Sequence, residues 1–159
     1  MSAVNTARVA AIRWPAIGGA AVHESPRPPY QQFVRMRDAF YVTGGLAPTD
    51  EVLVQLQTRH RHASELLAQW IDERQVICFE WQLRDWIPWF QFNRHSMAPH
   101  PQLQPVFTEL NAVYDAWELG HWFATPNPWL ASQLPVVALM TDLPAVLHAA
   151  RADRFIANG

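Results

Sequence analysis

LQPVFTELNAVYDAW, residues 103–117, shows the clearest periodicity of this chain. Its large apolar side chains recur at steps of three and four positions, at Leu103, Phe107, Leu110, Tyr114 and Trp117. Because 3.6 residues complete one turn of an α-helix, this spacing places all of them along one face. The stretch therefore predicts one helix that contributes an apolar stripe to a core.

Short helices are expected on the C-terminal side of this stretch. The turn-forming run from Thr125 to Pro128 ends the preceding segment, and two short helices follow. Asp142 is a suitable N-cap for the second of them, with Pro144 in its first turn. Its apolar positions are Val146, Leu147 and Ala150.

A β-hairpin is expected on the N-terminal side. The β-branched and aromatic runs Val76–Trp81 and Trp86–Phe92 are separated by residues 82–85. Pro88 lacks an N–H to donate, so the second strand is expected to be an edge strand or bulged at that point.

Three helices are predicted before the hairpin. The first spans Tyr30–Tyr41 and is stopped by Gly44 and Gly45. The second is capped by Thr49 or Asp50, and the polar run 58–62 turns the chain into a third that ends near Arg74. Their apolar stripes are Val52, Leu53 and Leu56 in the second helix, and Leu66, Leu67, Trp70 and Ile71 in the third.

The fold class is thus mainly α with one β-hairpin, in the form of a small helical bundle. Residues 1–29, with a Gly18-Gly19 pair and a proline-rich run, are interpreted as a flexible arm. Residues 30–98 have a helix-turn-helix-like order of helices followed by a hairpin, and residues 99–159 form a second helical domain. We expect no span through a membrane, because no apolar run approaches the ~20 residues that one needs.

Composition narrows the class of protein further. The 159 residues are 50% hydrophobic and 16% charged, and the 12 basic residues are all arginine, against 14 acidic residues. The absence of lysine excludes lysine chemistry, and the balanced charge argues against a protein that coats nucleic acid. A single cysteine, Cys78 in an apolar run, suggests a small buried side chain and a cytoplasmic protein without disulfides.

The sequence offers no set of residues with the spacing of a catalytic or metal site. His60 and His62 have no cysteine or carboxylate beside them at ligand spacing, and no serine has the glycine framing of a nucleophile elbow. Asp115 and Glu118 share a helix face, which an ordinary solvated surface explains. We therefore expect no catalytic residues, no metal and no cofactor.

Two surfaces are candidates for binding. Residues 50–92 have the element order of a winged helix-turn-helix DNA reader, in which Arg59 and Arg61 contact phosphates. The second helix of that unit, however, carries Glu65, Asp72 and Glu73. The other surface is the C-terminal third, where arginines lie among large apolar side chains, a composition typical of interface hot spots.

The C-terminal third also resembles a known family. The residues that carry the likeness are Trp122, Asn127, Leu130, Pro135, Leu139 and Gly159, and the upstream run Pro88–Phe92 is similar to a strand of a related subset. These positions resemble the toxin-binding domain of the Xre/MbcA/ParS antitoxin family, over roughly residues 86–159.

The resemblance implies a non-catalytic protein-binding module. Family antitoxins oligomerise and obstruct the active site of a partner toxin, often one of the RES type. The residues expected to meet a partner are Arg151, Arg154, Phe155, Trp129 and Asn127. Trp122, Leu130 and Pro135 are expected to hold the domain together. A DNA-binding transcriptional regulator that uses residues 50–92 is the alternative.

Overall fold

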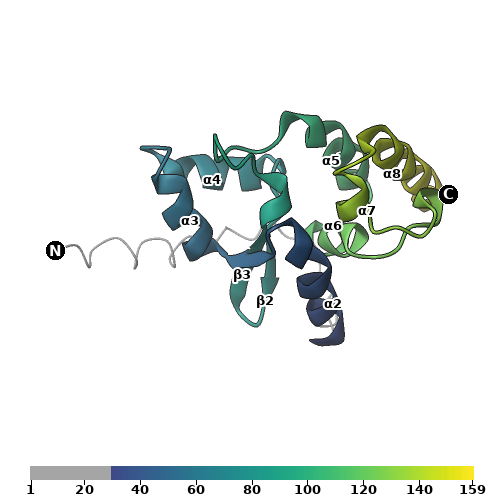
Figure 1. The fold of residues 1–159 in the computed structure, drawn as a ribbon, viewed down its shortest axis with the longest axis horizontal. Coiled ribbons are helices and arrows are strands. Elements are labelled where there is room, and N and C mark those ends of the chain that lie inside the picture. Colours follow the sequence, from purple (N-terminus) through teal and green to yellow (C-terminus); the bar gives the residue numbers. More distant parts are fainter. Residues whose placement is uncertain (1–29) are drawn as a thin grey trace, which may run out of the picture.

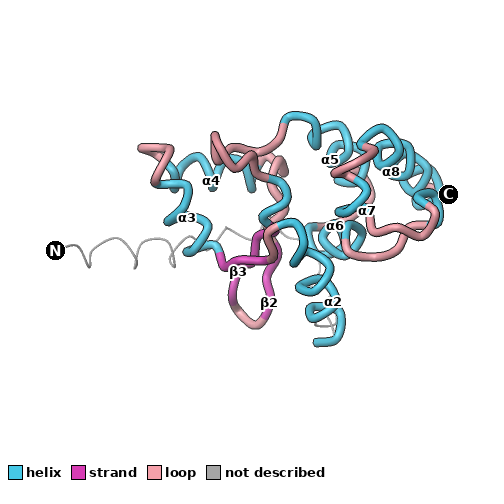
Figure 2. Tube along the Cα trace, in the orientation of Figure 1, coloured by secondary structure: helices cyan, strands magenta, loops and turns pink. Residues whose placement is uncertain are grey.

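The computed structural model describes residues 30–159, and the arm predicted for residues 1–29 lies outside them (Figure 1). Helices dominate this part of the chain, and its strands form one small antiparallel sheet (Figure 2). The prediction of a mainly helical fold with a β-hairpin is therefore confirmed. The helices are α2 (Tyr30–Phe40), α3 (Thr49–Gln57), α4 (Ala63–Asp72), α5 (Gln104–Asn111), α6 (Ala116–Phe123), α7 (Pro135–Ala138) and α8 (Leu143–Ala157). The strands are β1 (Leu46–Pro48), β2 (Phe79–Trp81) and β3 (Arg84–Pro88).

The sheet has a third strand that the sequence pattern did not reveal. Its order is β1-β3-β2, so β3 is the central strand, and the expectation that Pro88 marks an edge strand is wrong. Pro88 is tolerated because it is the last residue of β3, opposite Leu46, where the ladder ends. The hairpin turn comprises only Gln82 and Leu83, both with left-handed φ, and Arg84 already belongs to β3.

Both hairpin strands are shorter than predicted. The register of β2 and β3 extends to place Ile77 opposite Pro88, which has no N–H to donate, and after Pro88 the chain enters a 3-10 turn, Trp89–Gln91. The side chain of Gln91, which is 1% exposed, takes over this pairing. The Ile77 N–H donates to Gln91 Oε1 at 2.7 Å, and Gln91 Nε2 donates to the Ile77 carbonyl at 2.9 Å. One glutamine thus satisfies the buried backbone of Ile77.

The sheet separates two apolar clusters, as the alternation of strand side chains requires. Ile87 and Ala47 face α3 and α4 on one side, and Phe79 faces α2 and α5–α8 on the other. In Figure 1, α3 and α4 lie on the left, the sheet in the middle, and α5–α8 on the right. Residues before position 98 thus contribute to the same cluster as the C-terminal helices, and the domain boundary at 98/99 stays a prediction.

The single helix expected over residues 103–117 is instead two helices, α5 and α6. Asp115 begins α6: its Oδ1 accepts from the Glu118 N–H at 2.8 Å, and Glu118 Oε2 accepts from the Asp115 N–H at 2.9 Å. This capping box satisfies backbone N–H donors at the start of α6. Asp115 and Glu118, which the sequence analysis assigned to an ordinary solvated face, therefore have a structural role as helix caps. The break lets α5 pack on α8, while Trp117 of α6 meets Phe79 edge to face at 5.3 Å.

The start of α3 and the length of α8 differ from expectation, whereas the start of α8 agrees with it. The N-cap of α3 is Pro48 and makes no side-chain cap, whereas Thr49 Oγ1 donates to the Asp85 carbonyl of β3 at 3.2 Å. The cap at Asp142 is confirmed, because its Oδ1 accepts from the Ala145 N–H at 3.0 Å. The helix that follows is not short, since α8 has 15 residues.

Arg74 joins the two sides of the molecule. Its backbone has a left-handed φ of 56°, so the helical path of α4 does not continue past this residue. Its guanidinium donates to the carbonyls of Asn111 and Tyr114 at 2.9 and 2.7 Å, at the C-terminal end of α5. A cation at this end satisfies carbonyls that have no partner within the helix. No helix within residues 30–159 has the length and apolar content needed to cross a membrane.

Candidate protein-binding surface on α8

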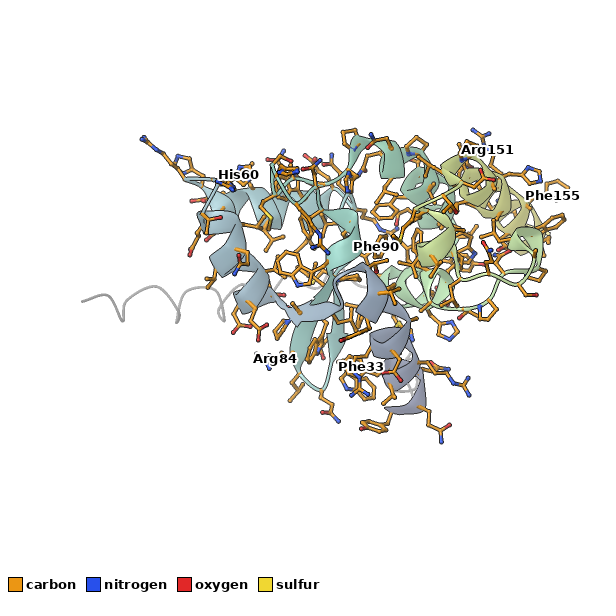
Figure 3. All side chains as sticks on the ribbon, in the orientation of Figure 1. Phe33, His60, Arg84, Phe90, Arg151 and Phe155 are labelled. Carbon is orange, nitrogen blue, oxygen red and sulfur yellow. The ribbon has the colours of Figure 1, made fainter. Side chains whose placement is uncertain are left out.

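Helix α8 is anchored at its start and middle and exposed at its end. Val146, Ala149 and Ala150 are fully buried, and the two small alanines allow α5 to approach closely. Near its C-terminal end two apolar side chains are exposed: Phe155 is 81% and Ile156 63% exposed. Figure 3 shows Arg151 and Phe155 at the surface of this helix. Trp129, Arg151, Arg154, Phe155 and Ile156 together are called the C-terminal patch.

The two arginines of the patch are held by one carboxylate. Arg154 Nη1 donates to Glu109 Oε2 at 2.7 Å, and Arg151 Nε donates to Glu109 Oε1 at 3.2 Å. Hydrogen bonds from Arg154 and then Arg151 lower the pKa of Glu109 below its usual value. Since a guanidinium has five N–H donors, each arginine keeps donors for another partner. Both side chains are therefore fixed in direction while still able to bind.

Asp153 organises the other side of the patch, although no motif in the sequence singles it out. Its Oδ2 accepts from Trp122 Nε1 at 2.7 Å and from Asn127 Nδ2 at 2.9 Å. Its Oδ1 accepts from Trp129 Nε1 at 3.2 Å. Hydrogen bonds to an ionised acceptor are stronger than neutral ones, so one carboxylate ties α6 and the following loop to α8. No spacing rule predicts that an aspartate meets residues 24 to 31 positions away.

Asn127 is buried and does not belong to the C-terminal patch. It is 5% exposed, and its Oδ1 accepts from the Trp129 N–H at 2.9 Å. Its backbone N–H donates to the Gln133 carbonyl at 3.0 Å, which closes the loop. Asn127 was predicted to meet a partner, but its side chain is buried and its amide oxygen and nitrogen both bond within the chain. The role that the structure shows for Asn127 is to position the loop that carries Trp129.

Trp129 is the half-exposed aromatic residue of the patch. Its ring is 50% exposed, and it lies edge to face with the His148 ring at 6.1 Å. Trp122 and Leu130, expected to hold this region together, are 8% and 7% exposed. An indole whose N–H is bound and whose ring remains partly in water resembles the anchors of protein interfaces.

A cavity of about 480 Å³ lies beside Asp153, with Tyr114, Trp117 and Glu118 in its walls. Burial, followed by the charges of Asp153 and Glu118, raises the pKa of Tyr114. Burial and the nearby Arg35 lower the pKa of His121, which also lines the cavity. The cavity therefore presents aromatic surface and negative charge next to the patch.

The predicted DNA-binding arginines lie on the opposite side of the molecule. Arg59 and Arg61 are exposed in the turn between α3 and α4. The order β1, α3, α4, β2, β3 is that of a helix-turn-helix followed by a hairpin. Residues 50–92 carry four arginines against seven acidic residues, and α4 itself contributes Glu65 and Asp72 without a cation. This excess of acidic residues weakens the attraction of the region for phosphates.

A metal centre and a nucleophilic cysteine are the two kinds of site at issue among the described residues. Within residues 30–159, no three His, Cys, Asp or Glu side chains lie close enough to hold a metal ion. Burial raises the pKa of the Cys78 thiol to about 12, with Asp85 contributing. The thiol therefore stays protonated at neutral pH, whereas a nucleophilic cysteine requires the thiolate.

Comparison of the chain with protein-family models, with curated protein sequences and with solved structures finds no match. The likeness to the antitoxin domain therefore stays a prediction, and the geometry of the C-terminal patch is the basis for a functional proposal.

Proposed function

We propose that this chain is a non-catalytic, antitoxin-like binding module that contacts a partner protein through the C-terminal patch and occludes the partner's active site. The observation that carries the proposal is the exposure of Phe155 and Ile156 beside two arginines fixed by Glu109. Aromatic and arginine side chains dominate the binding energy of protein interfaces. Holding them in place before binding reduces the entropy that association costs.

The partner follows from the resemblance in Trp122, Asn127, Leu130 and Pro135. It implies a toxin, with the RES type as the first candidate, and a homo-oligomer as the form of the antitoxin in the cytoplasm. The physical argument is that an aromatic ring on a helix end fills a narrow cleft, while an arginine beside it binds a carboxylate or carbonyls of the cleft wall.

The first experiment uses Phe155→Asp, because this side chain is 81% exposed and the change leaves the core intact. Leu83→Asp is the matched control: Leu83 is 92% exposed at the tip of the hairpin, far from α8. Tagged wild type, Phe155→Asp and Leu83→Asp are purified from the native cell, and co-purifying proteins are identified by mass spectrometry.

We expect one stoichiometric partner with the wild type and with Leu83→Asp, and none with Phe155→Asp. The partner's purified enzymatic activity should fall on addition of the wild type alone. Equal recovery of a partner by all three proteins, or a partner whose activity is unchanged, refutes the proposal.

DNA binding by residues 50–92 is the second candidate, favoured by the order of elements from β1 to β3. A mobility-shift titration with mixed-sequence duplex DNA at low salt tests it. Binding that weakens steeply with salt and is lost in an Arg59→Glu, Arg61→Glu double variant supports it. Absence of a shift at low salt removes it.

A further inference from the structure

Two neighbouring cavities flank Trp89, near the start of α8. The larger has a volume of about 610 Å³ and the second about 580 Å³. Trp89, Phe92 and Arg94 belong to the walls of both, and the two adjoining cavities are together called the Trp89 groove. Figure 3 places Phe90, which also lines the larger cavity, at the centre of the molecule.

The backbone under the groove fixes the position of Trp89. Its N–H donates to the Gly45 carbonyl at 3.0 Å. Gly44, with φ 111°, lies so close that a Cβ there would sit 2.9 Å from Trp89 Cβ. A glycine at position 44 is therefore required for Trp89 to occupy its observed position. The groove is thus already formed in the absence of a ligand.

Apolar side chains form much of the lining of the groove, and some of them are largely exposed. Leu103 and Val136 are buried in the wall of the larger one. On the rims, Val42 is 65%, Met140 69% and Val54 59% exposed. These side chains line the cavities yet stay largely exposed to water, and an amphipathic polypeptide segment laid along both cavities would cover them together.

The two cavities of the groove differ in the charged residues that line them. The walls of the larger cavity contain Arg94, His95 and His100 and no acidic residue. Arg94 is exposed and takes part in none of the ion pairs of the described residues. Glu51, in the second cavity, is the one acidic residue of the walls. No acidic residue within the described range 30–159 lines the larger cavity.

We propose that the Trp89 groove binds an acidic, amphipathic segment of a partner protein. Apolar side chains of the segment fill the two cavities and cover Val42 and Met140, while a carboxylate of the segment pairs with Arg94. A nucleic acid fits less well, because its backbone requires several cations and the groove supplies one arginine.

This site is separate from the C-terminal patch. Leu143, the first residue of α8, lines the groove, and Phe155 follows twelve positions later. At 1.5 Å per residue the two lie about 18 Å apart along the helix. Variants of the groove therefore leave the patch intact, and failure of one proposal is distinguishable from failure of the other.

A display library of random 16-residue peptides provides the test, with the folded wild-type chain as the target. We expect enriched peptides to combine Asp or Glu with Leu, Phe or Trp. One enriched peptide is then labelled and titrated against wild type, Arg94→Glu, Val42→Asp and Arg59→Glu. Arg59 is an exposed arginine outside the groove and serves as the matched control.

We expect binding to weaken about tenfold or more with Arg94→Glu and with Val42→Asp, and to stay unchanged with Arg59→Glu. A peptide with lysine in place of its acidic residues should also bind about tenfold more weakly. Failure to enrich acidic peptides, or equal binding to all four proteins, overturns the proposal. Sedimentation that shows a dimer dissolved by Val42→Asp also overturns it, because the occupant is then a second copy of the chain.

Discussion

Replacement of Asp153 by alanine tests whether this carboxylate holds the C-terminal region together. The change leaves the N–H groups of Trp122 and Asn127 buried without an acceptor, and that of Trp129 half exposed. An unpaired buried donor costs about 1–3 kcal/mol, and Trp129 can turn to water, so the free energy of unfolding should fall by about 2–5 kcal/mol. For a domain of this size, at about 2–4 °C per kcal/mol, the melting temperature should drop by about 4–20 °C.

Urea and thermal unfolding, followed by tryptophan fluorescence and circular dichroism, measure this loss. Asp153→Asn should cost less, because one oxygen remains to accept from the two buried donors. Asp72→Ala is the control: Asp72 is exposed at the end of α4 and accepts no side-chain hydrogen bond within the described residues. A loss below about 1 kcal/mol for Asp153→Ala refutes the role given to this carboxylate.

Three further predictions concern single positions. Gln91→Leu orphans the buried N–H and carbonyl of Ile77, and should cost about 2–4 kcal/mol in urea unfolding; an unchanged midpoint contradicts the pairing. Gly44→Ala combines a left-handed φ with a contact of 2.9 Å to Trp89, and should lower stability by more than about 1 kcal/mol and alter the Trp89 fluorescence. The pKa of Glu109 is lowered in the folded state, so its contribution to stability is present above the ordinary glutamate range and is lost as pH falls through the lowered pKa. Stability measured between pH 6 and pH 3 should therefore fall less for Glu109→Gln than for the wild type.

The local chemistry of the sequence determined the helices and their ends at several points. The steps of three and four at Val52, Leu53 and Leu56 correctly predicted a buried stripe, because burial of one helix face depends only on spacing. Asp142 followed by Pro144 correctly marked the start of α8. In each case the signal and the structure it predicts lie within one or two turns of each other.

Tertiary packing decided where the helical stretch 103–117 breaks, where a third strand forms and which distant residues meet, none of which follows from the spacing of apolar residues alone. The apolar stripe over 103–117 was compatible with one helix, but α5 must pack on α8 and α6 on β2, so the chain breaks at Asp115. β1 is three residues long and exists only because β3 supplies its hydrogen-bond partners. The Asp153 cluster, the Arg74 contact and the Trp89 groove each join residues far apart in sequence. The sequence by itself determined which segments are helical, whereas only the folded chain brought these distant polar groups together, because their partners are selected by the packing of whole elements.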